Sequence, residues 1–168
     1  MKNILKYALI LGGLTFFGSG CSEKLEPKPL TYTQLLTGDT KKAWLFSSII
    51  VVDNGTADPA LNARDIIDPC FADDQYVFYA GSEKKYEIAE GNSKCDPRDP
   101  DVYYTDSWSL VNANAQLEFV FPVLSSQNLP YVVKTLTANT LTVELYVDKV
   151  FPDGDNISYR ITFVSLVK

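Results

Sequence analysis

The residues of this sequence that could do chemistry are three cysteines, two clusters of acidic residues and a set of aromatic residues, and there is no histidine. Without histidine the chain has no Ser-His-Asp or Cys-His catalytic set, no histidine-ligated zinc and no histidine pH switch. Two carboxylates, Glu118 and Glu144, alternate with apolar residues in strand-like segments and should point outward. With no nucleophile placed beside a base, we expect a protein that is not an enzyme.

The N-terminal segment has the features of a secretory signal. Lys2 and Lys6 give it a positive start. Residues 7–17 are mostly apolar, but they are fewer than the roughly 20 that a membrane-spanning helix needs. Small residues follow, directly before a cysteine. We therefore interpret residues 1–20 as a signal peptide that is removed from the mature protein.

Cys21 is the predicted lipidation site. Gly18-Ser19-Gly20-Cys21 resembles the bacterial lipobox, in which a peptidase cuts before a cysteine whose thiol accepts a diacylglyceryl group. Several acyl chains such as palmitate hold a protein firmly, because each buried methylene contributes about 0.8 kcal/mol. Residues 21–30 would then be a lipidated tether of an outer-membrane lipoprotein, on the periplasmic or the surface face of the cell envelope. The alternative is a plain secretory signal with Cys21 unmodified.

The other two cysteines, Cys70 and Cys95, are predicted to form a disulfide. An exported chain enters an oxidising compartment, where paired cysteines are normally joined. Closing the loop between them is worth roughly 3 kcal/mol in the chain-entropy model. The alternative is two free, buried thiols.

The charge balance bears on partners and metals. The chain has 15 Lys and Arg against 21 Asp and Glu, with no run of basic residues, so we do not expect nucleic acid as a partner. Contact with a membrane is expected through the lipid anchor, and a protein partner is left open. Loop carboxylates can hold calcium, but their spacing here is not that of an EF-hand, so we expect no metal and no cofactor. The carboxylates in question are Asp96, Asp99, Asp101, Asp153 and Asp155.

The elements that must position these residues are mostly strands. A capping box at Thr31 and Gln34, followed by Gly38, predicts one or two helical turns over 31–38. After that, apolar residues alternate with polar ones, as is typical of strands with one buried face. The predicted strands cover 41–53, 74–80, 84–89, 103–111, 115–121, 130–137, 140–148 and 157–167.

Short turns join most of these strands, so neighbours should pair antiparallel. Eight such strands close well into a barrel without exposed edges. We therefore predict an all-β fold, an eight-stranded antiparallel up-and-down barrel, for one domain over residues 31–168, with a β-sandwich as the alternative. The disulfide would tie two long loops, 54–70 and 90–102, across one rim.

The residues expected to face the barrel interior are largely aromatic, because they occupy the apolar positions of the alternating pattern. They are Trp44, Phe46, Tyr76, Phe78, Tyr86, Trp108, Leu110, Leu117, Phe119, Val143, Leu145, Tyr159 and Ile161.

Several segments of the chain form a recognisable series: Leu36-Thr37-Gly38, Lys42-Ala43-Trp44, Cys70, Asp73-Asp74-Gln75-Tyr76-Val77-Phe78, Tyr86, Lys94-Cys95-Asp96-Pro97, Ser107-Trp108-Ser109-Leu110, Leu136-Thr137 and Leu141. This series resembles the lipocalin-like lipoproteins of Bacteroidota, over essentially the whole mature chain. The resemblance implies an eight-stranded calyx in which the first-strand Trp44 closes one end. Lipocalins typically carry glycine two residues before this tryptophan, where the present chain has Lys42.

Two functions fit these features. In the first, the barrel binds a small hydrophobic ligand through its aromatic interior, and acidic loops at the entrance disfavour anions. In the second, the rings fill the interior, and the barrel is a structural or interaction module of the cell envelope. A sizeable cavity would favour the first, and a filled interior with an exposed apolar patch the second. The candidate ligand-binding residues are Trp44, Phe46, Tyr76, Phe78, Tyr86, Trp108, Phe119 and Tyr159.

Overall fold

The computed structural model describes residues 30–151 and 155–166. The predicted signal peptide, the predicted lipidation site Cys21, the tether up to residue 29 and Asp153 lie outside the described residues. The described helices are α2 (Tyr32–Thr37), α3 (Ala63–Ile66) and α4 (Val147–Val150), and none of them is long and apolar enough to cross a membrane. The strands are β1 (Lys41–Asp53), β2 (Thr56–Ala57), β3 (Leu61–Asn62), β4 (Gln75–Tyr79), β5 (Lys85–Ala89), β6 (Val102–Ser107), β7 (Ser109–Val111), β8 (Gln116–Phe121), β9 (Ser125–Leu136), β10 (Thr140–Tyr146) and β11 (Ile157–Ser165).

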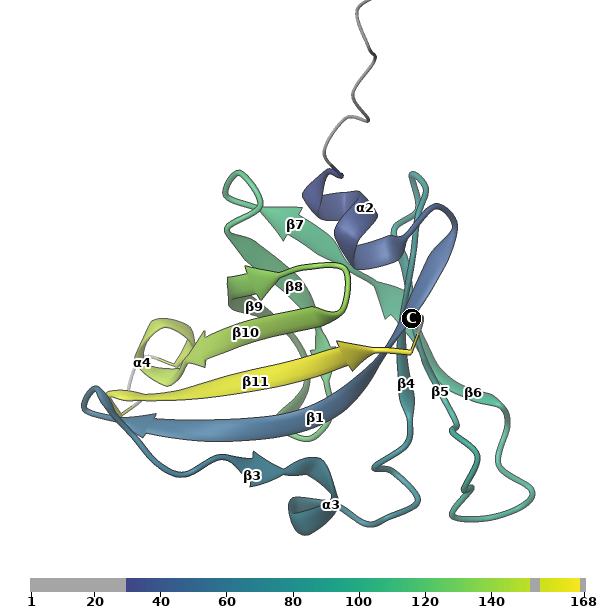
Figure 1. Ribbon diagram of the computed structural model, residues 1–168, viewed down its shortest axis with the longest axis horizontal. Helices are drawn as coiled ribbons and strands as arrows, with labels where there is room; N and C mark the ends of the chain where they lie inside the picture. The colour runs from purple at the N-terminus through teal and green to yellow at the C-terminus, as the bar shows by residue number, and fades with distance from the viewer. Residues whose placement is uncertain (1–29, 152–154, 167–168) are drawn as a thin grey trace, which may run out of the picture.

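The strands form one antiparallel sheet that curls into a nearly closed barrel (Figure 1). Its order is β6-β5-β4-β1-β11-β10-β9-β8-β7, and the first and last strands of this path are separated in sequence by Trp108 alone. One predicted strand, 103–111, is therefore split: β6 pairs with β5, and β7 pairs with β8. The prediction of an antiparallel up-and-down barrel is confirmed, and the sandwich alternative is not adopted.

The segment between β1 and β4 differs from the predicted plain loop, because it contains β2, β3 and α3. β1 pairs with β4 only over Lys41–Leu45, so the second half of β1 has an edge without a neighbour in the barrel. An open edge leaves backbone N–H and C=O groups unpaired. β2 and β3 pair with that edge, and the Asp58 N–H donates to the Val51 carbonyl at 2.9 Å.

Two other boundaries move for local reasons. β9 begins at Ser125, earlier than the predicted residue 130, because a tight turn returns the chain at once from β8. In that turn the Leu124 N–H donates to the Phe121 carbonyl at 3.0 Å. β10 ends at Tyr146, and the next residues form the single turn α4 instead of extending the strand.

The barrel has two unlike ends, on opposite sides of the molecule in Figure 1. The predicted helical turns form as α2, with the capping box at Thr31 and Gln34 intact. The end that we call the α2 end consists of α2 and the turns at 38–40, 80–84, 112–115 and 137–139. The end that we call the loop end consists of α3 and the segments 67–74, 90–101 and 122–124.

Candidate binding site at the loop end

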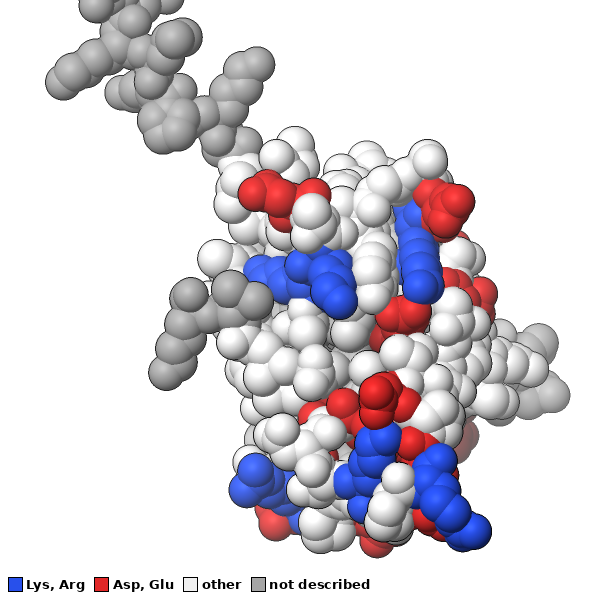
Figure 2. Space-filling model, turned by 90° about the vertical axis from the view of Figure 1, so that its right-hand side faces the viewer, with Lys and Arg blue, Asp and Glu red and all other residues white. Residues whose placement is uncertain are grey.

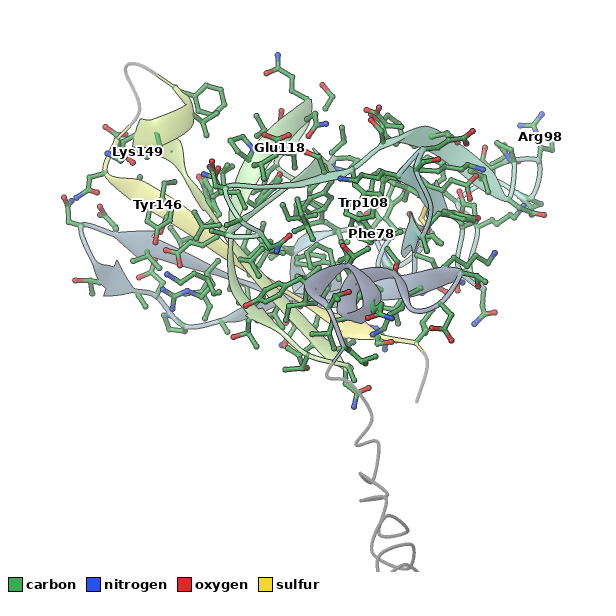
Figure 3. All side chains as sticks on the ribbon, turned by 90° about the horizontal axis from the view of Figure 1, so that it is seen from above. Phe78, Arg98, Trp108, Glu118, Tyr146 and Lys149 are labelled. Carbon is green, nitrogen blue, oxygen red and sulfur yellow. A yellow bond between two sulfur atoms is a disulfide. The ribbon has the colours of Figure 1, made fainter. Side chains whose placement is uncertain are left out.

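The aromatic residues predicted to bind ligand lie together, and they contact one another. The ring centroids of Phe78 and Tyr86 are 4.9 Å apart, and Phe119 lies 5.5 Å from Phe78 and 5.7 Å from Tyr86. Figure 3 shows Phe78 and Trp108 within the ring of strands, beneath α2. Trp44, Phe46, Tyr76, Phe78, Tyr86, Trp108 and Phe119 are all buried, and Tyr159 is half-buried against the same cluster.

Three further rings belong to this cluster, and the predicted inward set did not include them. Phe121 lies 5.1 Å from Phe46, Tyr131 lies 4.7 Å from Phe119, and Phe163 lies 5.3 Å from Tyr76 between ring centroids. Phe121 and Phe163 continue the alternation of their strands by one more step, so the pattern could have found them. Tyr131 lies within the predicted strand 130–137, but Leu129, the buried residue that alternates with it, lies before the predicted start.

Five pockets of the described residues lie outside the centre of this ring cluster. Their volumes run from about 260 to about 420 Å³, and each is open to solvent. The residues that line them do not include Trp44, Phe78, Tyr86, Trp108 or Phe119. The centre of the barrel is therefore occupied by the protein's own side chains, at the close packing normal for a core.

The α2 end is closed by hydrogen bonds from buried side chains. The Trp44 Nε1–H donates to the Leu36 carbonyl at 2.9 Å, which joins the first strand to α2. The Lys42 ammonium donates to the Leu35 carbonyl at 2.9 Å and to the Ala138 carbonyl at 2.5 Å. It also lies 4.4 Å from the centre of the Trp44 ring. Lys42 thus connects α2, β1 and the turn before β10, and burial lowers its pKa.

At the loop end a disulfide joins Cys70 to Cys95, and the predicted pairing is confirmed. Their Cα atoms are 5.2 Å apart. The bridge ties the segment after α3 to the long segment between β5 and β6, as expected. Cys70 directly precedes Phe71, which lines the pocket described next.

An apolar pocket of about 260 Å³ lies beside this bridge. Three aromatic residues line it: Tyr76 from β4, Tyr103 from β6 and Phe71 from the segment after α3. Phe71 is 44 % exposed, whereas Tyr76 is buried at its base. The other lining residues are Ile67, Asp74, Pro122 and Val123. Of the predicted ligand-binding set, only Tyr76 lines this pocket.

Asp74 is the one charged residue in the lining, and it is only 2 % exposed. The Tyr103 hydroxyl donates to its Oδ2 at 2.6 Å. Its Oδ1 is buried and has no hydrogen-bond partner of normal geometry, although the Gly91 N–H lies near the carboxylate. Burial raises the pKa of Asp74, and the hydrogen bond from Tyr103 opposes that rise only in part. A buried carboxylate with a free oxygen is costly, and such groups concentrate at functional sites.

Two more acidic residues lie next to Asp74. Glu90 is buried, its Oε2 has no partner, and burial together with the charge of Asp74 raises its pKa. The Asp73 Oδ2 accepts the N–H groups of Asn92 and Ser93 at 2.8 and 3.1 Å, while its Oδ1 is left without a partner. The chain passes so close to Asp73 that a Cβ at Gly91 would lie 2.3 Å from the Asp73 carbonyl oxygen. Glycine is therefore required at position 91.

Three of the acidic residues singled out in the sequence are engaged elsewhere. Asp96 pairs with Arg98 at 2.5 Å, Asp101 with Lys94 at 2.7 Å, and the Asp99 Oδ2 accepts the Asp96 N–H at 3.0 Å. Among the described residues no group of three or more acidic or cysteine side chains is placed to hold a metal ion.

The two strand carboxylates differ from each other. Glu118 accepts the Ser109 hydroxyl at 2.5 Å and is partly exposed. Glu144 was expected to be solvated on the outer face, but it is 2 % exposed. Ser158 and Arg160 on the neighbouring strand cover it, with hydrogen bonds of 2.6 and 2.9 Å. The alternating pattern indicates on which face of the sheet a side chain lies, but not whether neighbouring side chains on that face cover it.

No protein-family model and no curated protein matches this chain. The resemblance to lipocalin-like lipoproteins therefore stays a prediction, and function has to be argued from the site. The site combines an open apolar hollow, three aromatic walls, a buried carboxylate and a rigid frame made by a disulfide. It can hold a small ligand with an apolar body and one polar group.

Proposed function

We propose that this protein is a non-catalytic binding protein of the bacterial cell envelope whose ligand site is the pocket at the loop end. The observation on which the proposal rests is the contrast between the barrel centre and the loop-end pocket. The barrel centre is filled by rings in mutual contact, whereas the pocket beside Tyr76 and Tyr103 is open. The barrel then serves as the scaffold, and its rim provides the site.

The predicted lipid anchor agrees with this arrangement. The described chain begins at Leu30, directly before α2, so a lipid on Cys21 would hold the α2 end nearer to the membrane. The loop end is at the opposite side of the barrel (Figure 1). A ligand or its carrier could then approach the pocket from the aqueous side without displacing the membrane-facing end.

The pocket limits the size of the ligand. Drug-sized ligands occupy sites of roughly 300 to 1,000 Å³. At about 260 Å³ the pocket suits a single ring or a short branched chain. Aromatic walls supply contact area at low entropic cost, and one carboxylate fixes the orientation of a polar group.

Protein-observed NMR of the full-length protein in detergent tests this proposal. A panel of single-ring compounds with acidic, neutral and basic groups is titrated, and saturable shifts are expected at Ile67, Tyr103 and Val123. No more than propagated shifts are expected at Val143 and Ile161 in the core, because the core has no space for a ligand.

A pocket-filling variant, Val123→Trp, provides the matched test. It should abolish the shifts, whereas Thr135→Trp, on an exposed position of β9, should preserve them. Saturable binding that persists in Val123→Trp, or a panel that gives no saturable binding at all, would overturn the proposal.

A further inference from the structure

The ionisable side chains that line the loop-end pocket or lie next to Asp74 include three acidic ones. Asp74 lines the pocket, Glu90 and Asp73 lie next to it, and each of the three has one buried oxygen without a partner. The negative charge of Asp74 raises the pKa of Glu90, and that of Asp73 raises the pKa of Asp74, so the groups interact. The structure thus concentrates uncompensated carboxylate oxygens at one wall of an apolar hollow.

Two basic residues of this end are already engaged, whereas Arg64 on α3 lines a different pocket. Lys94 donates to Asp101 and to the Asp99 carbonyl, and Arg98 pairs with Asp96. Among the described residues, the ion pairs of this end do not reach Asp74 or Glu90. Figure 2 shows basic side chains gathered towards both ends of the β4–β6 face, with acidic side chains beside them. Asp74 therefore has no basic partner among the described residues, although the charge of Lys94 partly opposes the rise in the pKa of Glu90.

The remaining walls suit a cation as well. Phe71, Tyr76 and Tyr103 present aromatic rings to the pocket. The face of an aromatic ring is electronegative, and an organic cation within about 6 Å of its centre is attracted, more strongly where water is excluded. An anion would be repelled by the neighbouring carboxylates.

We propose that the loop-end pocket binds a small organic ammonium ion, whose charged group pairs with Asp74 and whose apolar part contacts Phe71, Tyr76 and Tyr103. The inference rests on the proposed function, because it names the ligand class of the same site. Binding would give a partner to the buried Asp74 Oδ1, for which the described chain provides no hydrogen bond of normal geometry. A buried carboxylate without a partner is strongly unfavourable, and a bound ammonium ion supplies that partner at the cost of its own desolvation.

A matched set of three probes tests this inference on the full-length protein in detergent. The probes are 2-phenylethylammonium, its neutral analogue 2-phenylethanol and the anion 3-phenylpropanoate. Isothermal titration calorimetry at neutral pH should give at least tenfold tighter binding of the ammonium ion than of the alcohol. The anion should bind more weakly than both.

Two variants on the same side of the molecule distinguish an effect of the charge at Asp74 from an effect of the protein's net charge. Asp74→Asn keeps the shape of the side chain and can still accept the Tyr103 hydroxyl, so the fold should persist. Asp74→Asn should weaken ammonium binding at least tenfold and leave the affinity for the alcohol unchanged. Asp106 lies on the same strand as Tyr103, and its exposed carboxylate accepts the Tyr104 hydroxyl at 3.0 Å. Asp106→Asn should change neither the affinity for the ammonium ion nor that for the alcohol.

The outcomes distinguish this inference from the proposed function. Equal binding of ammonium ion and alcohol, both lost in Val123→Trp, leaves the pocket as the ligand site and overturns its selectivity for cations. Preference for the anion, or an equal effect of Asp74→Asn and Asp106→Asn, overturns the inference in the same way. Binding that is indifferent to Val123→Trp overturns both.

Discussion

The α2 end and the loop end of the barrel are closed by different means. At the α2 end, the buried polar groups of Trp44 and Lys42 donate to backbone carbonyls of the chain itself. At the loop end, Asp73, Asp74 and Glu90 each leave one buried oxygen without a partner. A disulfide holds this end together, and an open apolar pocket lies beside it.

This difference separates groups that stabilise the fold from groups kept for another purpose. Buried polar atoms in native proteins are nearly always hydrogen-bonded, so each exception needs a reason. Here three of the four buried side-chain atoms without a partner in the described residues lie at one end. The fourth is the Tyr131 hydroxyl, in the aromatic core. We infer that the buried polar groups of the α2 end stabilise the fold. The carboxylates without partners at the loop end lower stability, and we attribute their presence to ligand binding.

The largest expected effect comes from Trp44→Ala. This change removes a buried indole and leaves the Leu36 carbonyl without its donor, so it should lower the free energy of unfolding by about 3–5 kcal/mol. Urea denaturation measures the loss. The loop-end counterpart is Phe71→Ala, which should cost less than about 1 kcal/mol because Phe71 is half exposed. Equal costs for the two variants would contradict the comparison.

The next effect tests the disulfide. The double change Cys70→Ser and Cys95→Ser should lower the free energy of unfolding by about 3 kcal/mol, mainly by freeing the unfolded chain. Hydrogen exchange should rise most at the Asn92 and Ser93 amides, which donate to Asp73, and least at Leu35 and Gly38 in the α2 end. A loss below 1 kcal/mol with even exchange would mean that other contacts hold the loop end.

The barrel could be predicted from the sequence because its determinants are local. Alternating residues such as Leu141, Val143 and Leu145 indicate both a strand and its buried face. Short turns then leave few ways to connect neighbouring strands. The small strands β2 and β3 were missed because they form only to cover the free edge of β1. That edge exists only once the tertiary pairing of β1 is known.

The site could be predicted only in part. The disulfide and the two long segments near the pocket follow from cysteine positions and loop length. Asp74 and Tyr103 were missed, because their 2.6 Å contact joins the starts of two strands that the sequence separates widely. Strand alternation places a side chain on a face, but it does not state which loop folds over which end. The adjacent acids Asp73 and Asp74 next to a buried strand were the one visible signal.

A smaller effect should come from removing one polar group at each end. Lys42→Met keeps the apolar stem but leaves the Leu35 and Ala138 carbonyls without their donor, which should cost about 1–3 kcal/mol. Asp74→Asn removes a buried charge that lacks a full set of partners, so the free energy of unfolding should stay within about 0.5 kcal/mol or rise. Thermal or urea unfolding at neutral pH compares them. A greater loss in Asp74→Asn would show that the loop end is stabilised by its carboxylate.

The smallest effect is a difference in pH dependence, and it compares Asp74 with Glu144, a carboxylate whose partners are complete. Burial raises the folded-state pKa of Asp74, so its contribution to stability is present below the unfolded pKa of about 3.9 and is lost as pH rises through the raised value. For Glu144, burial acts to raise the pKa, but hydrogen bonds from Ser158 and Arg160 outweigh it and the pKa is lowered. Its contribution is present above about 4.3 and is lost as pH falls.

The two variants should therefore show opposite slopes when the free energy of unfolding is measured by urea between about pH 3 and pH 7, a window that includes the range below about 4.3 where Glu144 acts. Relative to the unmodified protein, Asp74→Asn should gain stability as pH rises, because the variant avoids ionising a buried group. Glu144→Gln should lose stability as pH rises, because it forgoes a well-paired carboxylate. Burial and the charge of Asp74 raise the pKa of Glu90, so Asp74→Asn also reduces that rise, and Glu90 adds to the variant's gain as pH rises. Parallel slopes would show that the loop-end carboxylate is as well satisfied as the one on β10, and the contrast between the ends would then not hold.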